Sequence, residues 1–325
     1  MVLDLISATG GNARVNNFLS DRVFQRYLIV TEFYDCNTAL PPHQLVVNAI
    51  GDADAAAEAL VGAQSLVAHT AAPVINPPAA VLASGRCDVA RRLSSEPGVI
   101  TPQTMTWSRQ VLAAPDAGSR LTHHGFEFPL LLRTPGFHGG EHFLRVESRN
   151  ELPAALDKLP GSDLTVIQYL DARAPDGKTR KYRVMMIDGQ LYPLHAAISS
   201  NWKIHYFSAE MADCPEHRAE DAEFLVNMPD VLGPRALAAL EEIQKTLGLD
   251  YGGIDFGLDG KGEVLLFEAN ATMGVFPPEA DKRWDYRRPA VERIYRAVLE
   301  MLINRGSEVS RRDSKSHLPA SQQVA

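Results

Sequence analysis

The chain has 325 residues, 45% of them apolar and 22% charged, which is enough chain for roughly two or three folded domains and excludes global disorder. Its 40 acidic residues outnumber its 32 basic ones, and this net charge of −8 disfavours nucleic acid as the main partner. The cysteines, Cys36, Cys87 and Cys214, lack the spacing of a zinc site, and no apolar run is long enough to span a bilayer. We therefore expect a cytoplasmic protein that does not bind membranes; a homo-oligomer is compatible with this composition.

The N-terminal segment has the pattern of a small α/β domain. Apolar, β-branched runs typical of strands alternate with Ala-rich or amphipathic segments typical of helices. This pattern predicts strands at 26–33, 45–50, 65–68 and 73–75 and helices at 53–63 and 88–95. Because strand and helix alternate at this spacing, we expect one α/β layer near the N-terminus.

The rest of the chain contains more strands, with helices between them. We predict strands at 129–133, 142–146, 164–169, 181–188, 190–197, 253–258 and 263–269, and helices at 151–158, 216–227, 234–247 and 289–304. Asp188-Gly189 is a typical two-residue turn and joins two of these strands in a hairpin. The polar segment 306–325 has little to bury, so a disordered tail is expected there.

A Gly-rich loop follows the predicted strand that ends at Arg133. The common phosphate-binding patterns GxxxxGK[ST] and GxGxxG are absent, so any nucleotide site is built differently. Glycines let backbone N–H groups converge on an anion, and a cation at the strand end supplies matching charge. The loop residues that would form such a site are Gly136, His138, Gly139 and Gly140. The alternative is an ordinary hairpin with a flexible loop.

Two neighbouring predicted strands carry oxygen ligands near the C-terminal end. Glu268 and Asn270 are two apart on one strand and share a face, and Asp255 on the preceding strand can join them. Magnesium prefers such hard oxygen donors and completes its shell with water and phosphate. A solvated strand face is the alternative interpretation.

Two other segments have polar groups suited to ligand binding. The strand 164–170 ends in residues whose backbone groups can meet a purine edge, namely Gln168, Tyr169 and Leu170, while Arg183 points into the same site; taken alone, this is a core strand. The segment 195–211 mixes aromatic, amide and cationic side chains and could line an acceptor pocket through Asn201, Lys203 and His205. An exposed strand with ordinary polar residues is the alternative there.

Taken in order, these motifs resemble an ATP-grasp domain, nearest to the branch of ribosomal-protein glutamate ligases and glutathione-synthetase-like enzymes. The resemblance covers about residues 79–275. It implies an α/β and α+β fold in which two subdomains clamp ATP and Mg²⁺ behind a small N-terminal domain. The implied divisions are 1–96 for the N-terminal α/β domain, 97–170 for the lid subdomain, 171–305 for the C-terminal subdomain with the metal site, and 306–325 for the tail.

The resemblance also implies roles for single residues. Arg86 and Arg133 match the phosphate-contacting cations, which are usually Lys, and an Arg fork differs from a Lys point charge in phosphate geometry. Lys181 stands where this branch carries a ribose-binding acid, and Asp171 or Asp176 could substitute. The adenine hinge matches Gln168 to Leu170, the substrate or phosphate Arg matches Arg183, and the metal ligands match Asp255, Glu268 and Asn270.

The function implied is an ATP- and Mg²⁺-dependent ligase. A substrate carboxylate attacks the γ-phosphorus, ADP leaves, and an amine attacks the acyl phosphate to form an amide or peptide bond on a small molecule or peptide. Arg183, Lys203 and Asn201 are the candidate catalytic residues. The alternative function is a nucleotide-binding module without ligase turnover, because the usual lysines and the ribose acid are missing.

Overall fold

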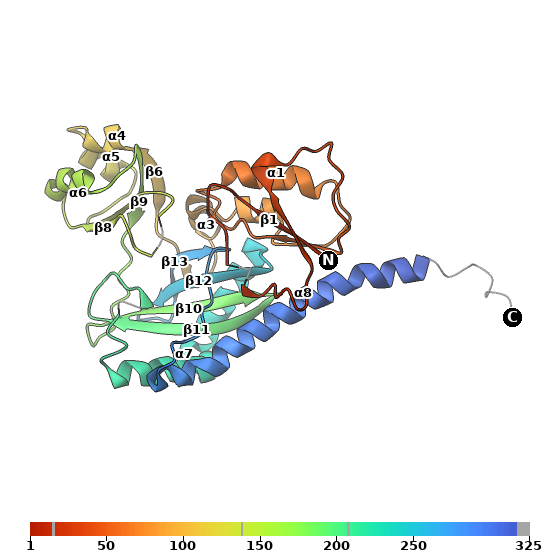
Figure 1. Cartoon of the computed structure of the whole chain (residues 1–325). Helices are drawn as coiled ribbons and strands as arrows, with labels where there is room; N and C mark the ends of the chain where they lie inside the picture. The colour runs from red at the N-terminus through yellow and green to blue at the C-terminus, as the bar shows by residue number, and fades with distance from the viewer. Residues whose placement is uncertain (15–16, 138, 207–208, 317–325) are drawn as a thin grey trace.

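The computed structural model describes residues 1–14, 17–137, 139–206 and 209–316, with side chains up to residue 307. The N-terminal domain is a parallel sheet in the order β2-β1-β3-β4, packed against helix α1 (Ala57–Val67) (Figure 1). The strands are β1 (Val2–Ile6), β2 (Arg26–Val30), β3 (Leu45–Asn48) and β4 (Val74–Ile75), and the 3-10 helix η2 (Thr31–Phe33) follows β2.

The predicted strand at 65–68 is wrong, because this segment completes α1. Its buried residues Ala59, Leu60, Ala63 and Leu66 follow a helical spacing, so the apolar stripe continues past the Ala-rich part. Two short helices, α2 (Pro78–Leu82) and α3 (Arg86–Arg92), then lead out of this domain.

The segment predicted as the lid subdomain contains an antiparallel sheet in the order β6-β9-β7-β8, which lies at the upper left of Figure 1; we call this part of the structure the lid. It has its own core, to which Leu121, Leu132 and Val166 contribute. Its strands are β6 (Thr104–Ser108), β7 (Leu130–Arg133), β8 (Phe143–Val146) and β9 (Asp163–Gln168), and its helices are α4 (Arg109–Ala113), α5 (Ala117–His123), α6 (Leu152–Lys158) and the 3-10 helix η3 (Arg149–Glu151).

The central sheet has the order β11-β10-β12-β13-β5 and is antiparallel except for the β13–β5 pair. Its strands are β5 (Val99–Ile100), β10 (Thr179–Ile187), β11 (Gln190–Ser199), β12 (Tyr251–Leu258) and β13 (Val264–Asn270). The predicted hairpin turn is confirmed, because Asp188 (φ 47°) and Gly189 (φ 79°) both have positive φ, as a type I′ turn requires.

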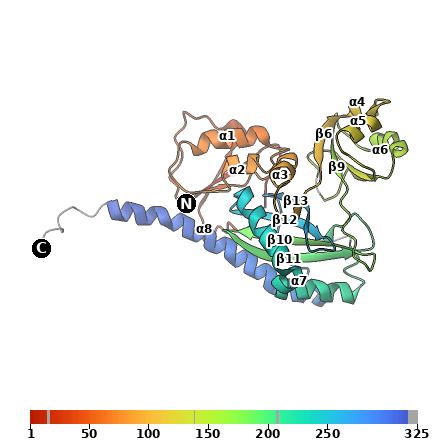
Figure 2. The same ribbon diagram turned by 180° about the vertical axis from the view of Figure 1, so that it is seen from behind.

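Two long helices pack on this sheet. Helix α7 (Pro215–Leu247) contains both helices predicted at 216–227 and 234–247, and its backbone leaves helical geometry at Asn227 and Gly233 between them. Helix α8 (Arg288–Ser316), preceded by the 3-10 helix η5 (Lys282–Arg287), runs away from the body of the protein (Figures 1 and 2). It continues past the predicted end at residue 304, so residues 306–316 are helical rather than part of the disordered tail predicted at 306–325, and residues 317–325 lie outside the described residues.

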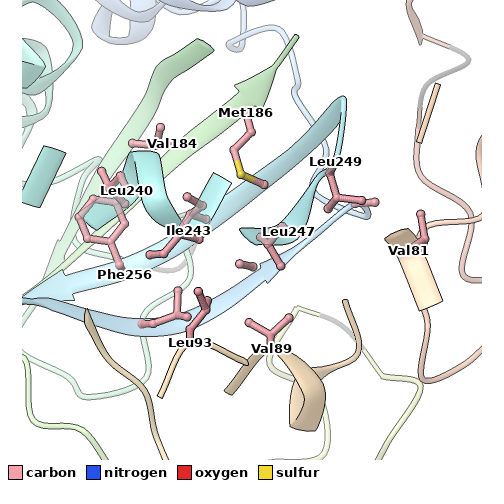
Figure 3. Close-up of a cluster of buried hydrophobic side chains, with 14 of the residues drawn as sticks. Val81, Val89, Leu93, Val184, Met186, Leu240, Ile243, Leu247, Leu249 and Phe256 are labelled. Atoms are coloured by element: carbon pink, nitrogen blue, oxygen red, sulfur yellow. The ribbon is translucent and has the colours of Figure 1, made fainter. Parts of the chain in front are cut away.

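A continuous core joins the N-terminal domain to the central sheet. Figure 3 shows Val184, Met186 and Phe256 of the sheet facing Leu240 and Ile243 of α7, with α2 and α3 side chains nearby. The same cluster includes Leu3, Val46 and Leu60 of the N-terminal domain, whereas the lid core is separate. The predicted α/β and α+β fold class is confirmed. No helix in the described ranges is long and apolar enough to cross a membrane.

Candidate active site

A cavity of about 720 Å³ lies between the lid sheet and the central sheet. The central sheet supplies β10, β12 and β13, the lid supplies β7 and β9, and the segment after β11 closes one side. The predicted site residues that line this cavity are Arg86, Arg133, Gly139, Gly140, Gln168, Tyr169, Leu170, Arg183, Lys203, Asp255, Glu268 and Asn270. Gly136 lines a smaller adjoining cavity of about 60 Å³, which shares Arg86, Arg133, Glu268 and Asn270.

Some of the predicted residues lie elsewhere. Asp171 is on neither cavity wall, and its carboxylate accepts two hydrogen bonds from the Arg173 Nε atom, at 2.9 and 3.0 Å. Asn201 also lies off both walls, in the turn after β11, where its N–H donates to the Ser199 Oγ atom. The alternative ribose acid Asp176 is paired with Arg180 at 2.9 Å. His138 lies outside the described residues.

Asp255 is held by two cations at the inner end of the cavity. Arg183 donates from Nε to Oδ1 at 2.5 Å and from Nη2 to Oδ2 at 2.7 Å, and Lys181 Nζ lies 3.0 Å from Oδ2. Arg183 is directly opposite Asp255 in the β10–β12 ladder, and Lys181 shares its face two residues away. Although burial alone would raise the pKa of Asp255, the charges of Arg183 and Lys181 hold it well below its usual range.

Glu268 is held in a similar way by the neighbouring Arg86. The Arg86 Nη2 atom lies 2.6 Å from the Glu268 Oε1 atom, and Asn270 Nδ2 donates to the same oxygen at 3.0 Å. Arg86 Nη1 also donates to the Phe267 carbonyl at 3.1 Å, which fixes α3 against the end of β13. Burial raises the pKa of Glu268, but the charges of Arg86 and Arg133 outweigh burial and lower it.

Arg133 completes a cationic cluster, which we define as Arg86, Arg133, Lys181 and Arg183. Its guanidinium donates to the Phe137 carbonyl and lies 6.0 Å from the Phe143 ring centroid. Burial and the nearby charge of Arg86 lower the pKa of Arg133. The cationic cluster carries more charge than the carboxylates of Asp255 and Glu268, so this end of the cavity favours an anionic ligand such as a polyphosphate.

Asp255, Glu268 and Asn270 supply the oxygen types that Mg²⁺ prefers. Asp255 and Glu268 are opposite each other in the β12–β13 ladder, and Asn270 is two residues further along β13. In the structure these oxygens already accept hydrogen bonds. Asp255 accepts them from Arg183 and Lys181, and Glu268 accepts one from Arg86. The Oδ1 atom of Asn270 accepts from the Thr272 N–H at 3.0 Å and from the Thr272 hydroxyl at 2.8 Å. The donor types fit the ion, which would replace some of these contacts. Over the described residues, no cluster of three or more His, Cys, Asp or Glu side chains suits a metal.

The other end of the cavity is aromatic. The guanidinium carbon of Arg145 lies over the Tyr169 ring, 4.6 Å from its centroid. The Trp202 ring centroid lies 6.3 Å from that of Tyr169 and 5.6 Å from that of Phe143. The side chain of Gln168 is not directed to a ligand, because it exchanges hydrogen bonds with the Glu127 backbone at 2.8 and 3.1 Å. The hinge therefore offers its backbone groups beside aromatic rings that meet edge to face, a setting suited to a purine.

Sequence reasoning missed several residues of the cavity wall. Trp202 belongs to the mixed aromatic segment already singled out, but its contact with the lid was not predicted. Lys203 Nζ donates to the Phe143 carbonyl at 3.3 Å, so the segment after β11 reaches the lid hairpin. Arg14, from the N-terminal domain, lies 5.0 Å from the Phe276 ring. No local motif marks Arg14; only the tertiary fold brings it to the site.

No protein-family model matches the chain, and no curated protein is significantly similar in sequence. Solved structures are similar in fold over nearly the whole chain. A D-alanine–D-alanine ligase from Bacillus anthracis is 14% identical with a TM-score of 0.60, covering 96% of this chain and 99% of that one. A RimK domain ATP-grasp protein from Sphaerobacter thermophilus is 15% identical, with a TM-score of 0.54 and coverage of 93% and 100%.

An ATP-grasp ligase solved with a precursor peptide and AMPPNP is also similar, with 15% identity, a TM-score of 0.52, and coverage of 94% of this chain and 97% of that one. These similarities extend through the N-terminal domain, the lid and the central sheet. The chain therefore has the ATP-grasp fold, as its motifs predict.

Proposed function

We propose that the chain is an ATP-dependent ligase that joins a carboxylate to an amine through an acyl phosphate. The observation that carries this proposal is the cationic cluster around the buried carboxylate of Asp255 and the partly buried carboxylate of Glu268, in a cavity that is also lined by aromatic side chains. The cationic end suits the phosphates of ATP, and the aromatic end suits its base. Similar folds that ligate D-alanine or act on a precursor peptide support an amide or peptide product.

In this proposal the chain positions the reactants and neutralises charge. The substrate carboxylate attacks the γ-phosphorus and the bond to the β-phosphate oxygen breaks, so ADP leaves. The amine then attacks the acyl carbon, loses a proton, and expels inorganic phosphate. Arg86 and Arg133 bind phosphate oxygens, Arg183 holds the transferring group, and Lys203 lies near the lid hairpin. Such a reaction needs no side-chain nucleophile, since positioning and electrostatics lower the barrier.

Asp255, Glu268 and Asn270 are the residues that would hold magnesium, which supplies charge neutralisation at the phosphates when bound. In the structure Arg183 forms an ion pair with Asp255, and Arg86 forms one with Glu268. Their guanidinium groups are therefore already placed at the inner end of the cavity, next to where the phosphates bind in this proposal.

A nucleotide-binding module without turnover is the second candidate function. One observation favours it: both oxygens of Asp255 are engaged by Arg183 and Lys181, at a position where a ligase needs a metal ligand. If these contacts persist with nucleotide bound, the chain binds ATP without activating a carboxylate.

The two candidates are separated by a turnover assay on the purified protein. The protein is incubated with ATP, Mg²⁺ and pooled amino acids or short peptides, and the products are analysed by mass spectrometry. We expect ADP together with a new amide mass. Glu268→Gln removes a charge while nearly preserving shape, so it should abolish turnover more than it weakens the fold; formation of ADP at the parent rate with saturating substrate would contradict this site assignment. ATP binding without product would support the second candidate, and an absence of both would contradict the proposed function.

A further inference from the structure

A second cavity, of about 270 Å³, adjoins the first one. Both are lined by Lys181, Arg183, His205, Gly274 and Phe276, so the two share a wall at the inner end of the large cavity. The second cavity lies between β11, the segment after it, and η5. We call it the side pocket. Its volume is below the range of about 300–1,000 Å³ typical of drug-sized ligands, so it suits a smaller molecule.

The side pocket contains a buried arginine that has no hydrogen-bond or ion-pair partner among the described residues. Arg287, the last residue of η5, is only 6% exposed, and its Nε atom has no hydrogen-bond partner. Within the described chain its guanidinium forms no ion pair, and its carbon lies over the Tyr206 ring, 4.1 Å from the ring centroid. The nearby buried carboxylate of Asp221 interacts with the charge of Arg287 but accepts its hydrogen bonds from other groups, so the donors of this buried guanidinium are costly to leave unpaired. The unused donors of Arg287 therefore indicate an anionic ligand.

The charged groups near Arg287 are occupied elsewhere. Asp221 accepts from the hydroxyls of Tyr206 and Tyr286 at 3.1 and 2.7 Å and from the Ala196 N–H at 2.7 Å. Arg283 is paired with Asp281 at 2.7 Å. On the side shared with the large cavity, Lys181 and Arg183 are bound to Asp255. Glu279 also lines the pocket, so it adds one negative charge at the wall.

His195 adds a second buried polar atom that has no partner in the part of the chain that the structure describes. It faces Arg183 across the β10–β11 ladder, is 5% exposed, and its Nε2 atom has no hydrogen-bond partner. Burial and the charges of Arg183 and Arg287 hold its pKa well below the usual range, so the ring is neutral. The rest of the wall is apolar or aromatic and includes Leu194, Met211 and Trp284.

We propose that the side pocket binds the carboxylate of the amine substrate, with Arg287 as its anchor. This inference rests on the proposed ligase function and names its acceptor as a free amino acid or the C-terminal residue of a short peptide. A guanidinium binds a carboxylate through two parallel hydrogen bonds, which fixes the orientation of the ligand. With the carboxylate on Arg287, the amine lies toward the wall shared with the large cavity, where it meets the acyl phosphate.

The test measures binding without turnover. The common amino acids in L- and D-form, a set of dipeptides, and the C-terminal amide of each are titrated against the protein by NMR, alone and with a non-hydrolysable ATP analogue and Mg²⁺. We expect at least one acid to bind and its amide to bind about 10- to 100-fold more weakly. Arg287→Met should weaken binding of the acid by a similar factor and leave the affinity for the amide unchanged. Arg287→Lys should restore part of the affinity for the acid.

Arg296→Met is the control, because Arg296 lies on the neighbouring helix α8, is exposed and does not line the side pocket. Melting curves of all variants exclude loss of fold. Equal binding of acid and amide, equal affinity in Arg287→Met, or no binding of any acid in either condition would overturn the inference. None of these outcomes affects the proposed function, since ADP and amide formation are measured separately. Conversely, acid binding that depends on Arg287 supports the side pocket even if turnover is absent.

Discussion

At the scale of single residues, the pairing of Asp255 and Glu268 with arginines is the main departure from a simple metal site. Four elements meet there: α3 supplies Arg86, β10 supplies Arg183, and β12 and β13 supply the carboxylates. Buried carboxylates without partners would be costly, so the arginines stabilise them in the ligand-free fold. The same arginines provide the positive charge that a phosphate ligand requires.

Arg133 gives the most direct residue-level prediction. If it binds a phosphate, Arg133→Met should weaken ATP·Mg²⁺ binding by about 1.5–3 kcal/mol, or about 10- to 150-fold, because a charge-assisted hydrogen bond is lost while much of the stem remains. Arg133→Lys should retain most of the affinity, since a point charge can still reach phosphate. Calorimetric titration measures the ATP·Mg²⁺ affinity of the parent, Arg133→Met and Arg133→Lys proteins.

Arg120→Met serves as the control for this experiment. Arg120 lies on α5 of the same lid, is exposed, pairs with Asp116, and does not line either cavity at the site. Equal ATP affinity in the parent and the Arg133→Met protein, with a lowered melting temperature in the latter, would assign Arg133 a packing role instead.

At the scale of elements, β1 carries an unusual buried acid. Asp4 is 0% exposed, neither carboxylate oxygen has a hydrogen-bond partner, and its ion-pair contact is Arg26 at 3.6 Å. The strand lies inside the parallel sheet between β2 and β3, and the side chain of Asp4 is fully buried on one face of that sheet, so water has no access to the carboxylate. Burial raises the pKa of Asp4 from 3.8 to about 6, and the charge of Arg26 only partly opposes this effect.

The pH dependence of stability follows from this raised pKa. The folded state favours the neutral acid, so its stabilising contribution is complete below about pH 4 and is lost as the pH rises through about 6. Between about pH 4 and 7 the parent should lose about 2–3 kcal/mol of unfolding free energy relative to Asp4→Asn, which cannot ionise. Urea unfolding of both proteins across this range measures the difference. A constant difference would mean that Asp4 has an ordinary pKa in the fold.

The elements that could be predicted are those with strong local signals. Pro234 and Gly248 mark the second half of α7, and Asp188-Gly189 marks the β10–β11 turn. Strand β1 was not predicted, because its apolar run is short and interrupted by Asp4. The prediction of a strand at 65–68 was wrong because a short apolar run fits a helix or a strand equally well. In the structure Leu66 belongs to the buried face of α1, so the segment is helical.

At the scale of the whole molecule, the site lies between two bodies with separate cores. The N-terminal domain and the central sheet share one core, and the lid has another. The sequence predicts the Asp255, Glu268 and Asn270 set, because spacing along neighbouring strands places them on one face. It does not predict Arg287, whose surrounding residues look like a charged surface segment; burial against Tyr206 results from the tertiary fold.

The central claim is that this cavity activates a carboxylate as an acyl phosphate, and oxygen transfer tests it most directly. The protein is incubated with ATP, Mg²⁺ and pooled amino acids and short peptides whose carboxylates carry ¹⁸O. Because the attacking carboxylate oxygen leaves with the phosphate, the account predicts inorganic phosphate that contains ¹⁸O, detected by its shifted ³¹P resonance, together with an amide product. Inorganic phosphate that contains oxygen only from ATP and water would contradict the account, because it would show hydrolysis without carboxylate activation.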